Sequence, residues 1–367
     1  MNNEAVYWIT LAHIPGWGTV KINSLIGQFC DDYKLSIEEF FHLTEADWQA
    51  LYGLESKDID ELNASRAELP NNAFLVEQLQ NEGYDLIPIT SSDYSQTLKS
   101  NFKPNHAPVL LYVKGNKQIL HEKSVAIVGS SEASDLALEF TDTIARKATL
   151  DFKVIVSGFA KGVDKQALDS ALKYTGQSII VLPQGIMTFC SGFKTYYKQI
   201  VEGDLLVVST FHPRSPWKAE LAMARNTVIY GLADEIYVAE SSDKGGTWSG
   251  VIDGLRRKRI IYVRKPEPGE ENANSLLIEK GASPVDLNGN LILDESALLA
   301  KKLDVKYGEK ILELLKTGEY TTKEILKRLD INWSDNRLRE FLKSQKEIET
   351  IKKKPLLYRS KQLTLFD

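Results

Sequence analysis

Two short turns rich in glycine and serine carry residue types that suit the binding of an anion. The first is Gly129-Ser130-Ser131, and the second runs from Ser157 and Gly158 to Lys161 and Gly162. Small side chains let a ligand approach the backbone, free amides donate hydrogen bonds, and the lysine adds positive charge. Tight packing of strands against helices is the alternative explanation for the glycines.

A second group of candidate ligands lies further along the chain. Gly245-Gly246-Thr247 opens a predicted helix, so its amides and the Thr247 hydroxyl are expected to cap a phosphate. Arg225 adds guanidinium donors. The candidate phosphate-binding residues are therefore Gly129, Ser130, Ser157, Gly158, Lys161, Gly162, Arg225, Asn226, Gly245, Gly246 and Thr247.

Each of the first two turns follows an all-apolar run, which is typical of a buried parallel strand. Further strands are expected along the chain, with helical segments between them. Repeated βα units predict an α/β fold, a doubly wound parallel sheet of the extended Rossmann-like type, whose ligands bind at the carboxyl ends of the strands. The predicted strands are Leu86–Ile89, Val109–Val113, Val125–Val128, Val154–Val156, Ser178–Leu182, Leu205–Val208, Glu235–Ala239 and Ile260–Val263. The predicted helices are Leu136–Leu150, Lys165–Tyr174, Thr195–Val201, Lys218–Tyr230 and Trp248–Arg257.

The two ends of the chain are predicted to be helical. Near the N-terminus, a glycine turn at Ile14–Thr19 resembles those of SAM-like and helix-hairpin-helix (HhH) modules, although a plain helix connection is the alternative. The C-terminal part is expected to form three helices and a basic hairpin, which is the winged-helix pattern. The predicted division is residues 1–65 (helical SAM/HhH-like module), 66–300 (core), 301–359 (winged helix) and 360–367 (tail).

The winged helix has two alternative roles. The predicted helices there are Tyr307–Leu315, Thr322–Leu329 and Asp335–Ser344, and the predicted hairpin strands are Ile348–Ile351 and Leu356–Tyr358. Contact with duplex DNA would use Asn336, Arg337 and Arg339 on the third helix and Lys352–Lys354 in the wing. A protein–protein contact is the alternative.

Composition narrows the function classes. The net charge of −5 argues against a uniformly basic coat for nucleic acid, but residues 301–367 hold 17 Lys and Arg against 11 Asp and Glu. Two cysteines and five histidines show no metal-ligand spacing, so we expect no metal and no cofactor. No targeting segment or long apolar run is evident, which predicts a cytoplasmic protein without a membrane span.

Several motifs in one order resemble the DNA-processing protein A (DprA/Smf) family. They are Val125–Ser130, Val156–Asp164, Ser178–Gly185, Arg225–Ala233 and Val238–Glu240, and the resemblance covers roughly residues 80–265. It implies a non-catalytic protein that binds single-stranded DNA in a positively lined Rossmann pocket and hands it to the RecA recombinase. The sequence leaves open whether the protein forms a homodimer.

Four positions depart from the family pattern. Ser131, Leu168, Thr210 and Thr227 stand where the family has Arg, His, Glu and Arg. Two missing guanidiniums remove bidentate phosphate contacts, for which Lys161 or the nearby Lys194, His212 and Arg214 are expected to compensate. Either DNA is held differently, or the pocket takes a smaller nucleotide as a sensor.

An enzyme is the remaining alternative for the core. The loop at Gly245 resembles that of nucleotide-sugar phosphoribohydrolases, which need a glutamate soon after the Gly-Gly-Thr motif. No glutamate follows Thr247 closely, so Asp253, Glu240 or Asp164 would have to supply the carboxylate. Helix capping and ion pairing explain these acidic residues equally well, and we expect no catalysis.

The last residues form a short apolar motif. Gln362, Leu363, Leu365 and Phe366 resemble the peptides by which bacterial proteins dock the replication sliding clamp. A last strand or a free chain end is the alternative. Together, the sequence predicts a protein that binds single-stranded DNA and acts in DNA recombination, repair, uptake or defence against foreign DNA.

Overall fold

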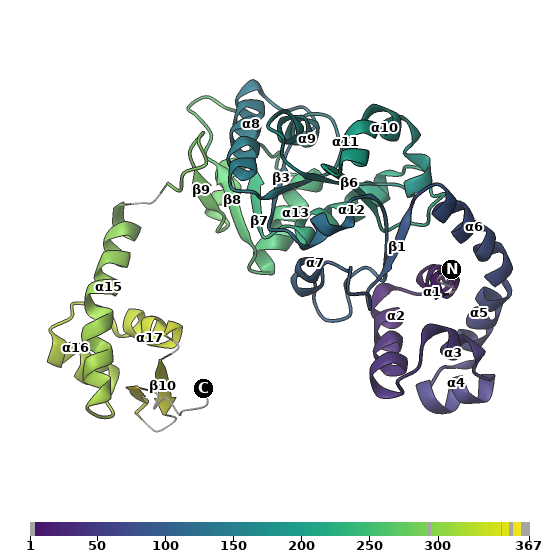
Figure 1. The fold of residues 1–367 in the computed structure, drawn as a ribbon. Coiled ribbons are helices and arrows are strands. Elements are labelled where there is room, and N and C mark those ends of the chain that lie inside the picture. The colour runs from purple at the N-terminus through teal and green to yellow at the C-terminus, as the bar shows by residue number, and fades with distance from the viewer. Residues whose placement is uncertain (1–3, 293–294, 346, 352–354, 361–367) are drawn as a thin grey trace. The chain divides into compact units, whose positions relative to one another are not determined.

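The structure, a computed structural model, describes residues 4–292, 295–345, 347–351 and 355–360 (Figure 1). The chain divides into two compact units, residues 1–292 and 293–367. The predicted boundaries differ from this division, because residue 65 lies inside helix α5 (Ser56–Ala67) and residue 300 inside helix α15 (Glu295–Lys316). The division into four parts with separate roles stays a prediction.

The first unit is built on a nine-stranded sheet whose strand order is β1-β2-β6-β5-β4-β3-β7-β8-β9. Strands β3 to β9 run parallel, whereas β1 and β2 join one side as antiparallel strands. This confirms the predicted α/β, doubly wound class. The strands are β1 (Asp85–Pro88), β2 (Leu110–Gly115), β3 (Ser124–Val128), β4 (Val154–Ser157), β5 (Ser178–Val181), β6 (Leu205–Ser209), β7 (Glu235–Val238), β8 (Ile260–Arg264) and β9 (Ser283–Val285).

Strand β3 is where the winding of the sheet reverses. Its neighbours are β4 on one side and β7 on the other, and between them the chain crosses from one half of the sheet to the other. Every residue of β3 is buried, as expected for a strand covered on both faces. Ligands of open α/β sheets bind beside such a switch point, so the fold itself indicates where the site lies.

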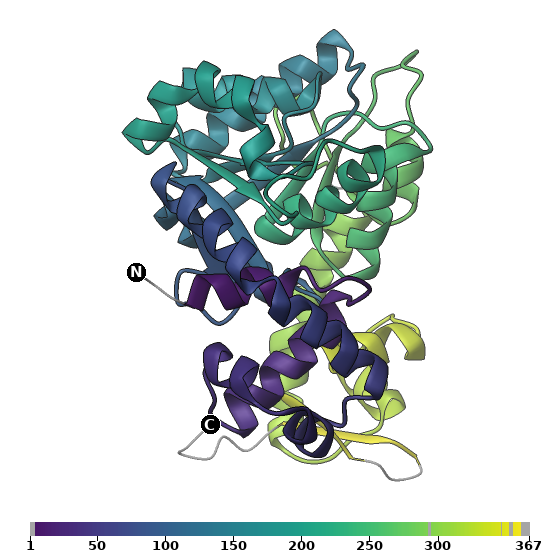
Figure 2. The same cartoon turned by 90° about the vertical axis from the view of Figure 1, so that its right-hand side faces the viewer.

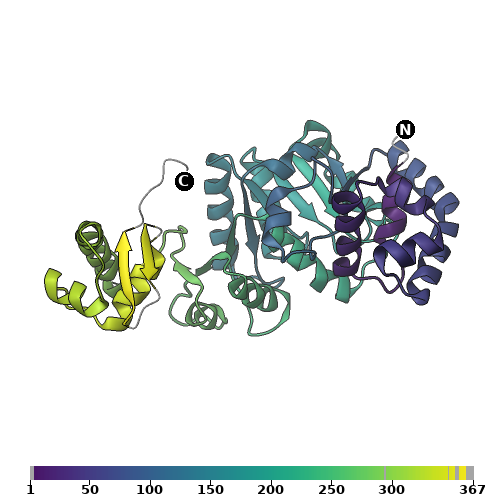
Figure 3. The ribbon, with the colours of Figure 1, turned by 90° about the horizontal axis from the view of Figure 1, so that it is seen from below.

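Helices cover both faces of the sheet (Figures 1 and 3). Val125 and Ile127 of β3 pack with α8 and α9, whereas Ala126 and Val128 belong to the core shared with α12 and α13. The helices of the core are α7 (Gln96–Asn101), α8 (Asp135–Leu150), α9 (Val163–Lys173), α10 (Cys190–Thr195), α11 (Tyr197–Glu202), α12 (Ala219–Leu232), α13 (Gly245–Arg256) and α14 (Asn274–Glu279).

The N-terminal helices gather at the β1 end of the sheet (Figures 1 and 2) and share its hydrophobic core. Their aromatic residues stack at the centre of the module, with the rings of Phe29 and Phe40 4.8 Å apart. These elements are α1 (Glu4–Ala12), α2 (Thr19–Ile26), a π-helical turn (Gly27–Asp32), α3 (Ile37–His42), α4 (Glu45–Tyr52), α5 (Ser56–Ala67) and α6 (Leu69–Asn81).

A partly buried histidine joins this module to the sheet. His13, just after α1, stacks on Tyr112 of β2, and its Nε2 lies 2.7 Å from the Tyr112 hydroxyl. The ring of His212, from the loop after β6, meets His13 edge-on at 5.2 Å. Burial lowers the pKa of His13 to about 3, and His212 adds to this effect. His13 is therefore neutral in the folded protein at ordinary pH.

The second unit contains three helices and a two-stranded antiparallel sheet: α15, α16 (Thr322–Leu329), α17 (Asp335–Ser344), β10 (Ile348–Ile351) and β11 (Leu357–Ser360). Thr321 and Glu324 form the predicted capping box of α16. Arg337 stacks over Trp333, and Arg339 pairs with Asp335 at 2.7 Å. The element order is that expected for a winged helix, and that assignment stays a prediction.

Some predictions fall on residues outside the structural description. These are the wing lysines 352–354 and the tail motif with Gln362, Leu363, Leu365 and Phe366. Within the described ranges, no helix is long and apolar enough to cross a membrane. The same ranges contain no cluster of three or more His, Cys, Asp or Glu side chains suited to a metal ion.

The first prediction concerns the stability of the unit as the pH falls. The pKa of His13 is lower in the folded than in the unfolded state, so stability is fully present above pH 6.5 and declines as pH falls towards 3. Between pH 6.5 and 5 we expect the wild type to lose about 2 kcal/mol of unfolding free energy that a His13→Gln variant does not lose. Urea unfolding at several pH values measures this. His42→Gln, at an exposed position, is the matched control and should keep the wild-type slope; identical slopes for His13→Gln and wild type would contradict the interpretation.

Candidate functional site

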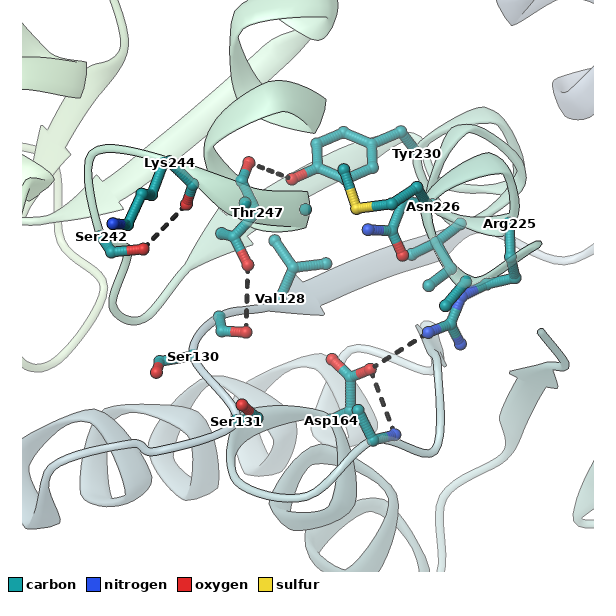
Figure 4. A pocket seen from close by; sticks show the side chains of 17 residues that line it. Val128, Ser130, Ser131, Asp164, Arg225, Asn226, Tyr230, Ser242, Lys244 and Thr247 are labelled. Carbon is teal, nitrogen blue, oxygen red and sulfur yellow. Dashed lines mark hydrogen bonds and ion pairs between the residues drawn. The ribbon is translucent and has the colours of Figure 1, made fainter. Parts of the chain in front are cut away.

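A pocket of about 370 Å³ lies at the switch point of the sheet (Figure 4). Four segments form its walls: the turn after β3, the turn after β4 with the start of α9, one side of α12, and the loop that leads from β7 into α13. We call this pocket the crevice. Seven of the predicted phosphate-binding residues line it: Gly129, Ser130, Arg225, Asn226, Gly245, Gly246 and Thr247.

The turn after β3 is held by its neighbours on both sides. A Cβ at Gly129 would lie 2.5 Å from Val163 Cγ2, so only glycine fits there. The Ser130 amide donates to the Glu240 carbonyl oxygen at 3.0 Å. Ser131 is exposed at the rim. Packing therefore accounts for Gly129, and the Ser130 amide is already engaged within the protein.

The turn after β4 lies beside the turn after β3, as the sequence predicts. The Val163 amide donates to the Ser130 carbonyl oxygen at 3.2 Å. Gly162 has φ of +73°, and a Cβ there would lie 2.4 Å from the same carbonyl oxygen. Ser157 is buried and its hydroxyl donates to the Ile127 carbonyl oxygen at 3.0 Å. Close packing, the alternative explanation given above, thus applies to Ser157 and Gly162.

A buried ion pair lies behind this turn. Arg225 Nη1 donates to the Val181 carbonyl oxygen at 2.6 Å, and Nη2 lies 3.9 Å from Asp164 Oδ2. Asp164 also accepts from the Ala160 amide at 3.4 Å. A Cβ at Gly158 would lie 2.1 Å from Arg225 Nη1, which explains the glycine.

Burial dominates the electrostatics of this pair. It raises the pKa of Asp164, and the Arg225 guanidinium opposes that effect. Arg225 is only 5% exposed, and its Nε has no hydrogen-bond partner among the described residues. The guanidinium is therefore largely engaged inside the protein, and its Nε is buried without a hydrogen-bond partner among the described residues.

The N-terminus of α13 is the most accessible anion site in the crevice. No side chain caps this 12-residue helix, whose first residues are Gly245, Gly246 and Thr247. The amides of a first helical turn have no partner within the helix, and the helix dipole favours negative charge there. The Thr247 hydroxyl, by contrast, donates to the Gly129 carbonyl oxygen at 3.0 Å. The Thr247 amide can therefore still bind a phosphate, as predicted, whereas the Thr247 hydroxyl is already engaged in a hydrogen bond within the protein.

Sequence reasoning did not single out three residues of the crevice. Lys244, just before α13, is exposed, and Met223 on α12 is half exposed. The Tyr230 hydroxyl donates to the Thr247 carbonyl oxygen at 3.3 Å and supports the start of α13. Met223 and Tyr230 lie three residues before and four residues after Asn226 on the same helix. This spacing places them on the same face as Asn226, and it was the sequence signal that could have identified them.

Other predicted cations lie away from the crevice wall. Lys161 is exposed and does not line the pocket, and neither does Lys194. Arg214 donates to Gln78 of α6 at 2.9 Å, and His212 packs on His13. The two cations among the predicted phosphate ligands differ in their ion pairs. Arg225 pairs with Asp164, whereas the Lys161 side chain forms no ion pair within the described part of the chain.

The carboxylates considered for hydrolysis are engaged elsewhere. Glu240 accepts a hydrogen bond from the Ser134 hydroxyl, and Ser134 caps α8. Asp253 pairs with Arg257 at 2.7 Å and lines a different, smaller cavity. Among the described residues that line the crevice, Asp164 supplies the one carboxylate, and it is buried.

Comparison with known proteins assigns this architecture to a protein family. A family model described as DNA recombination-mediator protein A matches residues 85–296. The chain belongs to this family. The match spans the sheet and the crevice, and it confirms the resemblance seen in the sequence motifs.

Similar proteins carry names that agree with this family. Protein Smf of Synechocystis is 27% identical over 316 residues, which cover 82% of this chain and 73% of that protein. DNA processing protein DprA of Streptococcus pneumoniae is 34% identical over 158 residues, or 43% of this chain and 55% of that protein. The X-ray structure of DprA from Streptococcus pneumoniae has a TM-score of 0.59 at 23% identity, covering 78% of this chain and 95% of that chain, which establishes a shared fold.

The second prediction concerns the role of Arg225. We expect Arg225→Met to cost about 3 kcal/mol of unfolding free energy, because it leaves Asp164 buried without its cation. The double variant Arg225→Met/Asp164→Leu should recover most of this loss, since it removes both charges together. Urea unfolding of the two variants measures the difference. A mild effect of Arg225→Met would show instead that the pair contributes little to the fold.

Proposed function

We propose that this protein binds single-stranded DNA in the crevice, without catalysing a reaction, and acts in DNA processing during recombination, repair, uptake or defence against foreign DNA. The observation that carries the proposal is the uncapped N-terminus of α13, which faces a pocket at the switch point of the sheet. Membership of a family described as recombination mediators supports the same role.

The electrostatics of the crevice suit a phosphate. The amides of Gly245, Gly246 and Thr247 supply directed donors, and Lys244 adds an exposed positive charge beside them. The Arg225 guanidinium, which is buried, contributes its positive charge from behind the wall instead of a direct contact. Lys161 is proposed to attract the strand at longer range, because it is exposed and lies outside the pocket.

The size of the crevice favours an unpaired strand. About 370 Å³ lies at the lower end of the range for small-ligand sites, so it suits one nucleotide unit at a time. A neighbouring wall of small residues, such as Ala222 and Gly246, lets the backbone of a strand come close. A duplex would present its phosphates to this pocket only from outside.

Finer parts of the proposal concern partners. We propose that the strand is handed to the RecA recombinase, that the tail from Gln362 to Phe366 docks the sliding clamp, and that the second unit contacts duplex DNA or protein through Asn336 and Arg339. A homodimer is compatible with this role. Support for these steps comes from the sequence motifs alone.

A second candidate function is a nucleotide sensor. The same pocket volume and phosphate site would fit a mononucleotide signal, and Ser131, which lines the crevice, stands where the family pattern has a guanidinium. Binding of a mononucleotide without affinity for oligonucleotides would favour this candidate. Release of a base from nucleoside monophosphates would instead establish a phosphoribohydrolase.

The third prediction tests the crevice itself. Lys244→Glu places a negative charge at the start of α13 and should weaken binding of oligo-dT about tenfold or more, with the salt slope reduced by about 0.7 per lost phosphate contact. Fluorescence anisotropy across a salt series measures both quantities. Lys57→Glu, at an exposed position on α5, is the matched control and should bind as the wild type does. Equal affinity and slope for Lys244→Glu and wild type would overturn the assignment of the site.

The fourth prediction concerns the tail. Deletion of residues 362–367 is expected to abolish co-purification with the sliding clamp, because the apolar anchors Leu363, Leu365 and Phe366 are lost. Affinity for oligo-dT should stay at the wild-type level. If the intact protein shows no association with the clamp, the motif is coincidental.

A further inference from the structure

A second pocket, of about 290 Å³, lies on the other side of α12 from the crevice. Ala224, Thr227 and Val228 of α12 line this second pocket, whereas Arg225 and Asn226 line the crevice. Successive residues of a helix are rotated by about 100°, so these two sets point in opposite directions. One helix thus separates two pockets of different character.

The second pocket is lined largely by aromatic and aliphatic side chains, with His106 as the titratable residue in its lining. Trp17 from the α1–α2 turn, Phe102 from the end of α7 and Phe211 from the loop after β6 contribute rings to its lining. None of its lining residues is an Asp, Glu, Lys or Arg, in contrast to the crevice with Asp164, Arg225 and Lys244. Apart from the His106 ring, an ionic group would find no charged partner here, whereas a planar neutral group would find apolar walls.

The hydroxyls of Thr19, Thr210 and Thr227 and the ring of His106 supply the polar part of this pocket. Thr210 and Thr227, two positions that depart from the family pattern by replacing Glu and Arg, both line it. The Thr227 hydroxyl donates to the Ala224 carbonyl oxygen at 2.8 Å and keeps its acceptor lone pairs. With threonines at these two positions, the pocket is suited to a neutral ligand with a hydrogen-bonding edge.

We propose that the second pocket binds an unstacked nucleobase of the strand whose phosphate occupies the crevice. A nucleobase has an apolar face for the rings and polar edges for the hydroxyls. An α-helix is about 10 Å across with its side chains, so a strand that crosses α12 over Met223 reaches the second pocket within about three nucleotides. This inference rests on the proposed function, because it assigns the base to a strand already bound in the crevice.

The experiment fills the second pocket without adding charge. Ala224 is exposed on α12 and lines only the second of the two pockets, so Ala224→Phe should occupy it and preserve the helix. Ala219→Phe, at the exposed first residue of the same helix and in neither pocket, is the matched control. Circular dichroism and urea unfolding establish that both variants are folded.

The fifth prediction compares three ligands by fluorescence anisotropy: oligo-dT of about 12 nucleotides, the same backbone without bases, and a labelled mononucleotide. Ala224→Phe should weaken binding of oligo-dT at least about fivefold, with an unchanged salt slope, because the loss of a stacked base involves no ions. Affinity for the abasic strand and for the mononucleotide should equal that of wild type.

The outcomes separate the two proposals. Equal binding of oligo-dT by Ala224→Phe and Ala219→Phe, while Lys244→Glu still weakens it, overturns the second pocket and leaves the crevice intact. An equal loss on the abasic strand shows that Ala224→Phe acts on the backbone path and likewise overturns the base site. Failure of the wild type to bind any strand overturns the proposed function, and the base site with it.

Discussion

The close contact between the turns after β3 and β4 is the constraint on which the site depends. Gly162 approaches the Ser130 carbonyl oxygen, Gly129 approaches Val163, and Gly158 lies against the Arg225 guanidinium. None of these contacts leaves room for a Cβ, so the glycines fix the distance between the turns. The buried pair of Arg225 and Asp164 then ties α12 to the start of α9. Without this packing, the crevice would have no defined wall opposite α13.

This arrangement divides the polar groups of the site into two kinds. The groups that the sequence most readily suggests, such as the Arg225 guanidinium and the Ser157 hydroxyl, are mainly engaged inside the protein. The groups left for a ligand are backbone amides at the start of α13, with Lys244 beside them. A site built mainly from amides recognises phosphate with few cationic side chains, which is consistent with Ser131 lining the crevice where the family pattern has a guanidinium. Thr227, the other position where the pattern has arginine, lines the second pocket instead.

Helix α12 contributes to several features of the first unit. Its residues line both the crevice and the second pocket. Arg225 also contacts β5 through a hydrogen bond to Val181, and Tyr230 near the end of the helix supports α13. The N-terminal helices contribute Trp17 to the second pocket and share the hydrophobic core of the sheet. The helical module therefore contributes to a ligand-sized pocket in the same unit as the crevice.

The sequence by itself determined the α/β class, because continuous apolar runs such as those at β3 and β6 form strands only when both faces are covered. It also located the crevice, since glycine turns at the ends of such strands meet at one edge of the sheet. The sequence pattern predicted that α15 begins at Tyr307, whereas the helix begins at Glu295. Helix ends are weakly encoded where no proline or glycine interrupts the chain. Only the tertiary structure decided that Arg225 is buried, that Lys161 lies outside the pocket, and that Thr210, Thr227 and Trp17 share a second pocket. The physical reason is that local sequence patterns report which face of an element is apolar, whereas the partner of a charge and the closure of a cavity depend on side chains far apart in the chain.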